Sequence, residues 1–248
     1  MDSRLPGDSA GMTARIRVLC RDQNGTLTLS ADQPLEPDQP VLLGREGDLG
    51  VGISPVDPKV SRQAVQVTRT DAGWRIVVTN RNGVIVHPWG QPPGMAEPES
   101  VFSWPRLALR VVGRPQLQHW ILLDDPALQP RRPEPLPGTE LTESAEQPRP
   151  LTVPQELAVR ALFAELLTWP PLVPATPRQI KQVASRLGVR TESIQRRLEE
   201  VRKKAGMVGL SRTSLLTDPE YLYVLVRAGY LAPDEDDLHP ILTAAGAV

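Results

Sequence analysis

The chain has 248 residues, a formal net charge of −1 and a hydrophobic fraction of 40%. This length suits two modest domains, the hydrophobic fraction suits packed cores, and the charge excludes a protein that is basic as a whole. The single cysteine, Cys20, excludes an intrachain disulfide framework and is typical of a reducing compartment. No segment resembles a signal peptide, and no run approaches the ~18 apolar residues that span a membrane. We therefore expect a cytoplasmic protein with no membrane partner.

Residues 14–124 alternate apolar and polar side chains in the manner of β-strands. In ARIRVLC, Ile16, Val18 and Cys20 alternate with arginines, and GTLTLS, GWRIVVTN, GVIV, RLALRVVG and QHWILL follow with β-rich patterns. Turn signals such as QNG, EPDQP, TDAG, RNG and QPPG separate these segments. Many short strands without a helical pattern predict an all-β antiparallel sandwich over this half of the chain.

Three polar clusters, GR, SR and NRNG, stand at strand ends in this half, where the loops of a sandwich often carry binding residues. The candidate site residues in them are Arg45, Ser61, Arg62, Arg81 and Asn82. If the loops converge, their guanidinium, hydroxyl and amide groups suit a phosphate of about −1.5 to −2 charge. Ordinary alternatives exist, because Arg45 also fits a solvated strand end, Ser61 a turn, and Asn82 with its following glycine a hairpin.

The order and spacing of LLGR, VSRQA and NRNGVIV resemble the forkhead-associated (FHA) domain, whose pattern is Gly-Arg, Ser-Arg-any-His and Ser-Thr-Asn-Gly-Thr. The resemblance covers residues 40–90 by motif, and the whole β-rich half if the strands are included. It implies a β-sandwich that binds phosphothreonine peptides. By position, Arg45 and Ser61 would hold the phosphate, Arg62 would assist, and Asn82 would grip the peptide backbone.

Two positions depart from the family pattern. Ala64 stands where the family has a histidine that braces the binding loops, and Arg81 stands where it has Thr or Ser. Arg81 would either replace a hydroxyl contact by a charge contact or remove the selectivity for threonine. If the missing imidazole loosens the loops, Ala64→His should tighten phosphopeptide binding or raise the melting temperature.

The second half of the chain has a different character. Residues 125–150 hold seven prolines and almost no apolar periodicity, which predicts an extended, semi-stiff linker. Apolar residues at helical spacing then predict a helical domain over 151–232, and an acidic tail follows at 233–248. The first helical pattern runs from Val153 to Trp169.

Two further helices are expected in this domain. One begins with Thr176 as its N-cap and Pro177 at the first helical position, and the next begins with Thr191 as its cap. Ile194 and Leu198 belong to the buried stripe expected on the latter. The pair has the spacing of a helix-turn-helix, and QVASRLGVRTESIQRRLEEVRKKAG resembles that motif in response-regulator and sigma-factor C-terminal domains.

The charge distribution is consistent with a DNA-binding surface on these helices. Residues 151–212 hold 11 Lys and Arg against 5 Asp and Glu, a net of +6. Gln195 and Arg196 are the candidates for reaching base edges. The candidate phosphate contacts are Lys181, Arg190, Arg197, Arg202, Lys203 and Lys204. The alternative is a solvated helix with ion pairs such as Glu199–Lys203. If the helices do bind DNA, the acidic run DEDD of the tail would compete with DNA for the same basic surface.

No catalytic signature is visible. There is no Walker loop, no Ser/His/Asp pattern and no metal-ligand spacing, so we expect a non-enzyme without cofactor or metal. The sequence predicts a signalling protein whose FHA-like sandwich reads the product of a Ser/Thr kinase. Its expected partners are a Ser/Thr-phosphorylated protein and that kinase. Two hypotheses stay open for the helical domain: a regulator that binds DNA, and an adaptor that binds another protein.

Overall fold

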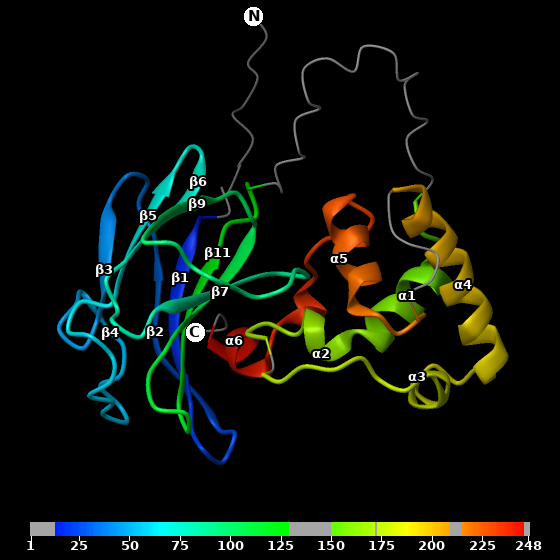
Figure 1. The fold of residues 1–248 in the computed structure, drawn as a ribbon, viewed down its shortest axis with the longest axis horizontal. Helices are drawn as coiled ribbons and strands as arrows, with labels where there is room; N and C mark the ends of the chain where they lie inside the picture. The colour runs from blue at the N-terminus through cyan, green and yellow to red at the C-terminus, as the bar shows by residue number, and fades with distance from the viewer. Residues whose placement is uncertain (1–12, 129–149, 172, 209–214, 246–248) are drawn as a thin grey trace, which may run out of the picture.

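The computed structural model describes residues 13–128, 150–171, 173–208 and 215–245. Two β-sheets form the first part of the chain and helices form the second (Figure 1). Most of the linker predicted over 125–150 and the last residues of the acidic tail lie outside the described residues. Among the described residues, no helix is both long and apolar enough to cross a membrane.

The first sheet has six strands in the order β2-β1-β11-β10-β7-β8, and its pairs are antiparallel. These strands are β1 (Arg15–Arg21), β2 (Leu27–Pro34), β7 (Val84–Pro88), β8 (Gly94–Met95), β10 (Arg106–Val111) and β11 (Gln118–Asp124). The second sheet has the order β4-β3-β5-β6-β9, with β4 parallel to β3. Its strands are β3 (Pro40–Gly44), β4 (Leu49–Gly50), β5 (Val65–Thr70), β6 (Gly73–Val78) and β9 (Glu99–Phe102). The β-rich, two-sheet character predicted for this region is confirmed.

The two sheets pack face to face around an apolar core. Because side chains alternate along a strand, β1 sends Ile16 and Val18 into this core and β11 sends Ile121 and Leu123. Trp74 of β6 fills the core from the opposite sheet and is fully buried. This inner core is the one that strand alternation predicts.

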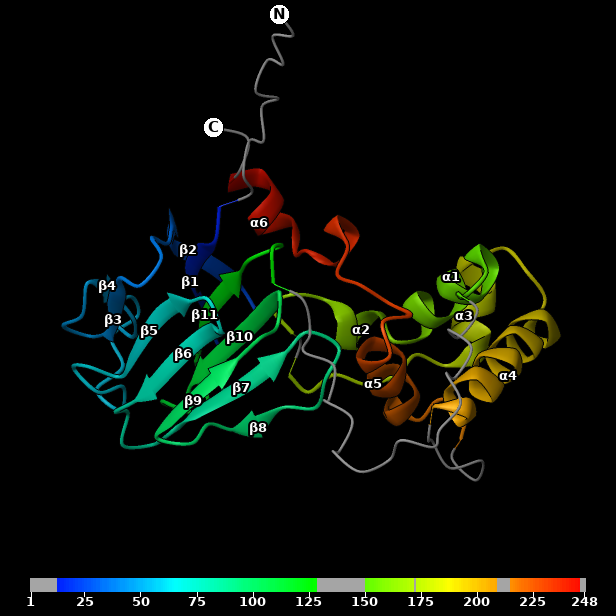
Figure 2. The ribbon, with the colours of Figure 1, turned by 90° about the horizontal axis from the view of Figure 1, so that it is seen from above.

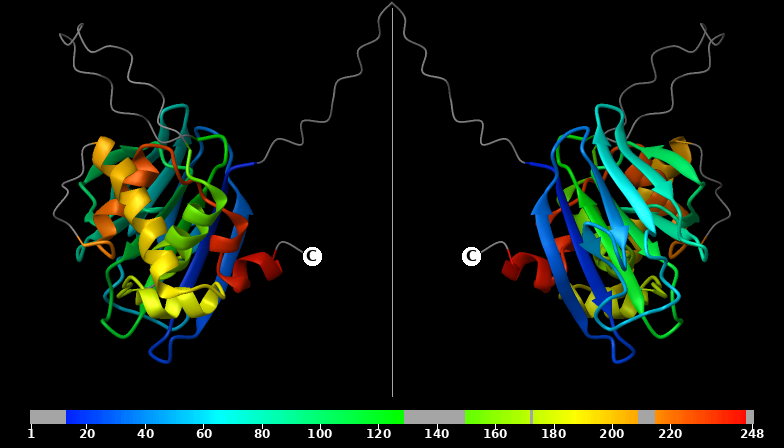
Figure 3. Two further views of the ribbon diagram at one scale, coloured as in Figure 1. Left: turned by 90° about the vertical axis from the view of Figure 1, so that its right-hand side faces the viewer. Right: turned by 90° about the vertical axis from the view of Figure 1, so that its left-hand side faces the viewer.

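The outer face of the six-stranded sheet is covered as well, although arginines alternate with the core residues of β1. Leu19, Trp120 and Leu122 point to this outer side and share one apolar cluster with helical residues such as Leu162 and Phe163. The helices of the described residues lie on this side, so this part of the molecule is layered as helices, sheet and second sheet (Figures 2 and 3). The helical part therefore rests directly on the sandwich.

The helical part begins with an interrupted helix. Its elements are α1 (Val153–Leu162), α2 (Ala164–Leu167), α3 (Ile180–Arg186), α4 (Thr191–Met207), α5 (Pro219–Arg227), the 3-10 turn η1 (Glu235–Asp237) and α6 (Pro240–Ala245). The single helix expected over 153–169 is wrong, because Phe163 leaves helical geometry with φ −101° and ψ 22°. The interruption puts the fully buried side chain of Phe163 in the core against the sheet.

Helix α3 begins later than the sequence predicts. Thr176 does not cap it; its backbone N–H donates to Glu165 Oε2 over 3.3 Å instead. Gln179 is the N-cap residue, and its N–H donates to Gln182 Oε1 over 3.2 Å. The side-chain amides of Gln179 and Gln182 provide hydrogen-bond partners for free backbone N–H groups at the start of the helix. Thr176 and Pro177 therefore lie before the helix and not within it.

Helix α4 largely follows its prediction. Its N-cap is Arg190 rather than Thr191, one residue earlier than expected. The expected stripe residues Ile194 and Leu198 are buried against the other helices, and Val201 is buried beside them. Helices α3 and α4 are thus adjacent, but their resemblance to a helix-turn-helix stays a prediction.

Candidate functional site

Three segments of the five-stranded sheet meet at one groove: the turn after β3, the loop before β5 and the turn after β6. All five residues predicted to bind phosphate line this groove of about 830 Å³, namely Arg45, Ser61, Arg62, Arg81 and Asn82. Lys59 and Glu46 line it as well. Its lining therefore holds four cations against one carboxylate, which favours an anionic ligand.

A close backbone contact seats the first of these segments on the second. A Cβ atom at Gly44 would lie 2.2 Å from the carbonyl oxygen of Arg62, so only glycine fits at this position. The backbone N–H of Arg45 donates to the carbonyl of Ser61 over 3.2 Å, and that of Glu46 to the carbonyl of Arg62 over 2.8 Å. The Gly-Arg and Ser-Arg clusters are therefore held together by their backbones.

The side chains of Arg45 and Ser61 keep donors for a ligand. Arg45 is half-buried, and its Nε donates to the carbonyl of Val60 over 2.7 Å, which orients the guanidinium. The Oγ of Ser61 accepts the backbone N–H of Arg81 over 3.2 Å. Because this bond uses Ser61 as an acceptor, its hydroxyl proton remains able to donate to a phosphate oxygen.

Asn82 joins the third segment to the second. Its Nδ2 donates to the carbonyl of Lys59 over 2.8 Å, while the residue itself is exposed. The next residue, Gly83, has a φ of +82°, the left-handed conformation that the turn alternative predicts. Asn82 thus has a structural bond within the chain, and its amide oxygen is left as an acceptor for a bound peptide.

Asn80 is the residue that sequence reasoning missed. It is 5% exposed, and its Oδ1 accepts the backbone N–H of Ser61 over 3.0 Å. Its Nδ2 donates to the carbonyls of Gly83 and Val112 over 2.8 and 3.0 Å. One side chain therefore ties together two loops of the groove and the end of β10. A polar residue at a strand end directly before a turn was the available signal, because Asn commonly bonds to nearby backbone.

Ala64, the position of the missing histidine, is fully buried. Its backbone N–H donates to the carbonyl of Leu43 over 2.7 Å, and its carbonyl accepts the N–H groups of Thr79 and Asn80. The loops around it are therefore braced by backbone bonds and by the Asn80 amide.

A second buried group, Asp57, ties the loop before β5 to His119 and Arg114. The carboxylate of Asp57 is completely buried and lies 3.0 Å from Nε2 of His119. It also accepts the backbone N–H groups of Arg114 and Lys59 over 2.7 and 3.0 Å. Burial acts to raise the pKa of Asp57, but these hydrogen bonds outweigh it and the pKa is lowered. The sequence offered no signal for this pair, whose members are 62 residues apart.

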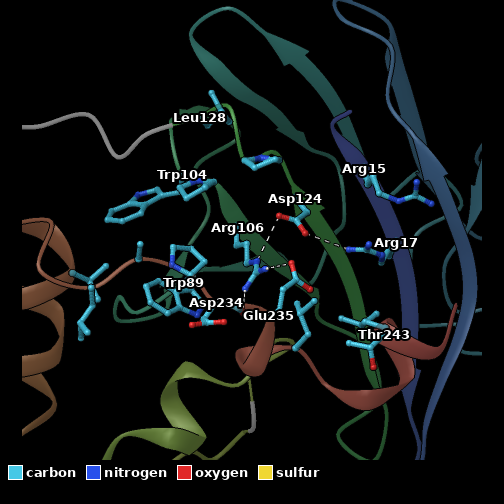
Figure 4. Close-up of a pocket in the computed structure, with 18 of the residues that line it drawn as sticks. Arg15, Arg17, Trp89, Trp104, Arg106, Asp124, Leu128, Asp234, Glu235 and Thr243 are labelled. Atoms are coloured by element: carbon cyan, nitrogen blue, oxygen red, sulfur yellow. Dashed lines mark hydrogen bonds and ion pairs between the residues drawn. The ribbon is translucent and has the colours of Figure 1, made fainter. Parts of the chain in front are cut away.

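A larger cavity of about 1140 Å³ lies between the outer sheet face and the C-terminal segments (Figure 4). Its buried arginines already have partners within the chain. Arg106 donates to the carbonyl of Asp234 over 2.7 Å and lies 3.5 Å from Asp124, which also contacts Arg17 (Figure 4). These cations are therefore parts of the packing between sheet and helices.

The acidic run of the tail, Asp234 to Asp237, lies beside this larger cavity, which Asp234 and Glu235 line. Glu235 is 3.8 Å from Arg106, and Asp237 lies 3.1 Å from Arg160 of α1. The run thus contacts Arg106 and Arg160, at the junction of sheet and helices.

The residues predicted to contact DNA are distributed over α3 and α4. Lys181, Arg190, Gln195, Arg196 and Lys203 are exposed, and Arg197 is partly so. Arg202 forms an ion pair with Glu199, the residue expected to pair with Lys203, and Lys204 donates to the carbonyl of Pro150 over 2.6 Å. The other six side chains thus lie wholly or partly at the surface.

Metal ligation finds no support in the described part of the chain, where no group of three His, Cys, Asp or Glu side chains is placed to hold an ion.

Comparisons with known proteins add little to this geometry. No family model and no curated protein matches the sequence. Several solved structures match, among them the crystal structure of Mycobacterium tuberculosis Rv1747 FHA-1, at 13% identity over 44% of this chain and 97% of that one. The TM-score is 0.26, a value too low to establish a shared fold. The structure itself shows a β-rich N-terminal region with two sheets, followed by a few helices.

Proposed function

We propose that the chain is a phosphothreonine-peptide-binding signalling protein that acts downstream of a Ser/Thr kinase. The observation that carries this proposal is the convergence of Arg45, Ser61, Arg62, Arg81 and Asn82 on one groove. Guanidinium groups and a hydroxyl donor suit the three oxygens of a phosphate, and a neighbouring amide suits a peptide backbone. These groups are suited to holding a ligand, so binding is the function proposed.

Arg45 is the residue on which binding should depend most. Its guanidinium is oriented by Val60 and would form charge-assisted hydrogen bonds to the phosphate. Losing such bonds costs at least about 1.5 kcal/mol, or about tenfold in affinity.

Fluorescence polarisation with a phosphothreonine peptide library tests the proposal. The full chain should bind phosphorylated peptides better than their unphosphorylated twins, and Arg45→Ala should weaken this binding about tenfold or more. Arg75→Ala is a matched control, because Arg75 is an exposed strand arginine that pairs with Glu99 outside the groove. Equal binding of phosphorylated and unphosphorylated peptides would refute the function.

For the helical part we propose DNA as a second ligand, with a protein-binding adaptor as the alternative. The supporting observation is the exposure of Lys181, Arg190, Arg196 and Lys203 on α3 and α4, at the end of the molecule opposite the groove strands β3 and β4 (Figures 1 and 2). Because the two surfaces are far apart, a phosphopeptide and a second ligand can bind together.

A salt series separates the regulator from the adaptor. Binding to genomic DNA fragments should weaken steeply with salt, and removing one phosphate contact by Lys203→Gln should flatten the slope of log K against log salt by about one unit. Arg196→Ala should relax base preference instead. If the full chain shows no DNA binding at low salt, the adaptor hypothesis stands.

A further inference from the structure

A third cavity, of about 430 Å³, lies on the outer face of the six-stranded sheet, away from the phosphate groove. We call it the Arg110 cavity. Arg110 of β10 and His87 of β7 contribute to its floor, and Trp169 and Leu166 line it from the segment around α2. Arg110 pairs with Ile85 across the strands and His87 pairs with Ala108, so the register places both polar side chains on the same sheet face.

Arg110 differs from the other arginines of this face. Arg17 and Arg106 both contact Asp124, whereas no Asp or Glu lines the Arg110 cavity and no ion pair of Arg110 exists in the described residues. Burial lowers the pKa of Arg110, but a guanidinium stays charged in proteins. A half-buried cation without a counter-ion is costly, and an anion in the cavity would offset that cost.

Three buried polar atoms around this cavity lack a hydrogen-bond partner within the described part of the chain. They are Nε of Arg110, Nε2 of His87 and Nε1 of Trp169. His87 is 7% exposed and Trp169 is 1% exposed, so bulk water does not reach these rings freely. Buried polar groups are normally satisfied, and three unsatisfied ones around a single cavity indicate a place for an acceptor.

Much of the remaining wall is apolar and stiff, although Gln91, Thr168 and Tyr223 also line it. Ile85, Met95 and Leu166 supply aliphatic contacts, and four prolines of the lining restrict the backbone: Pro88, Pro93, Pro171 and Pro174. The volume lies within the range of small-molecule pockets, which are mostly apolar with a few polar groups that orient the ligand.

We propose that the Arg110 cavity binds a small organic carboxylate with an apolar body. Its carboxylate would pair with the guanidinium of Arg110, and its apolar body would lie against Ile85, Met95 and Leu166. The ring of His87 is neutral near pH 7, because burial and the charge of Arg110 lower its pKa to about 4. A neutral imidazole and the indole N–H of Trp169 are both able to donate to a carboxylate oxygen after small side-chain adjustments.

Isothermal titration of the full chain with benzoate, and with its neutral isostere benzamide, tests the site. We expect saturable benzoate binding with a Kd of about 1 mM or tighter, as suits so small a ligand, and at least about tenfold weaker benzamide binding. Arg110→Met keeps the apolar stem and should reduce benzoate binding to the level of benzamide. Arg75→Met, which changes an exposed side chain on β6 of the other sheet, should leave it unchanged.

A second variant covers the case in which Arg110→Met fails to fold. Leu166→Trp, which fills the cavity from α2, should block benzoate while Arg110 is intact. The proposal is overturned if neither benzoate nor octanoate shows saturable binding, if benzamide binds equally well, or if Leu166→Trp leaves benzoate binding unchanged. A crystal grown with benzoate would also overturn the proposal if it showed ordered water, and no benzoate, bonded to His87 and Trp169.

Discussion

The groove lined by Arg45, Ser61 and Arg62 and the outer face of the six-stranded sheet both carry arginines, and the environments of these arginines differ. In the groove, Arg62 is 73% exposed and its one ion pair, with Glu46, is also exposed. On the sheet face, Arg106 is 7% exposed and lies among the acidic groups of Asp124 and Glu235. Exposed pairs contribute little to stability and leave a cation available, whereas a buried cation must be compensated within the protein or by a ligand. The difference supports the proposal that the groove arginines contact a ligand, whereas Arg17 and Arg106 of the sheet face serve packing and Arg110 is the exception.

The largest effect should come from breaking the buried pairs. Asp124→Ala removes the carboxylate shared by Arg17 and Arg106 and leaves both cations under-compensated, which should lower the free energy of unfolding by about 3 kcal/mol. Urea denaturation of the full chain measures this change. The matched control is Glu99→Ala, which breaks the exposed pair with Arg75 and should cost no more than about 1 kcal/mol. Equal costs for the two variants would contradict the distinction between the regions.

The second effect concerns the protonation of His87 beside Arg110. The folded chain holds the pKa of His87 at about 4, below its ordinary value of 6.5, because the ring is buried and faces a cation. Between these two values the unfolded chain binds the extra proton and the folded chain does not, so stability falls as the pH drops from 6.5 to about 4. The full loss is about 3 kcal/mol. His87→Phe should flatten this part of the pH profile of urea midpoints, and an unchanged profile would contradict the assignment.

The third effect separates the sequence-based expectation for Ala64 from the structural one. The family resemblance predicts that Ala64→His tightens the loops. Ala64 is fully buried, however, and Asn80 already braces the groove, so an imidazole at this position would have to displace neighbouring core atoms. We expect the variant to lose about 1–3 kcal/mol in stability by overpacking. A raised melting temperature would show that the core has room for the ring.

These two regions also differ in how far the sequence predicts them. The strands and the five groove residues follow from alternation and from clusters at strand ends, because both signals are local. The packing of helices on the outer face could not be predicted in this way. In the sequence, the arginines of β1 look like solvent-facing residues, because their partners Asp32 and Asp124 are not adjacent to them in the chain. Asn80 and Asp57 were missed for a related reason: the bond from Asn80 to Ser61 spans 19 residues and the bond from Asp57 to His119 spans 62, so the sequence does not show that these residues meet.

The helical part shows the same limit. The stripe of α4 is visible as spacing, whereas the break at Phe163 follows from packing against the sheet, which no local pattern encodes. Helix α3 starts at Ile180 because Gln179 is its N-cap and bonds to Gln182, while Thr176 donates to Glu165, 11 residues earlier in the chain. Helix content was thus predictable, and the ends of the helices were less so.

The smallest effect should come from Glu46, the single carboxylate of the groove. Its Oε1 lies 3.2 Å from Nε of Arg62, so it competes with a phosphate for that guanidinium and repels the phosphate charge. Glu46→Gln removes the charge and keeps the shape, and should tighten phosphopeptide binding by at most about 1 kcal/mol, or roughly fivefold, because both side chains are well exposed. The gain should shrink as salt is added, since exposed charges are screened.

Fluorescence polarisation at two salt concentrations measures the effect of Glu46→Gln. Glu99→Gln is the control, because that carboxylate has a similar exposure and pairs with Arg75 outside the groove. Weaker binding by Glu46→Gln would show instead that Glu46 holds Arg62 in its binding position, and Arg62 would then belong with the arginines whose partners fix them in place.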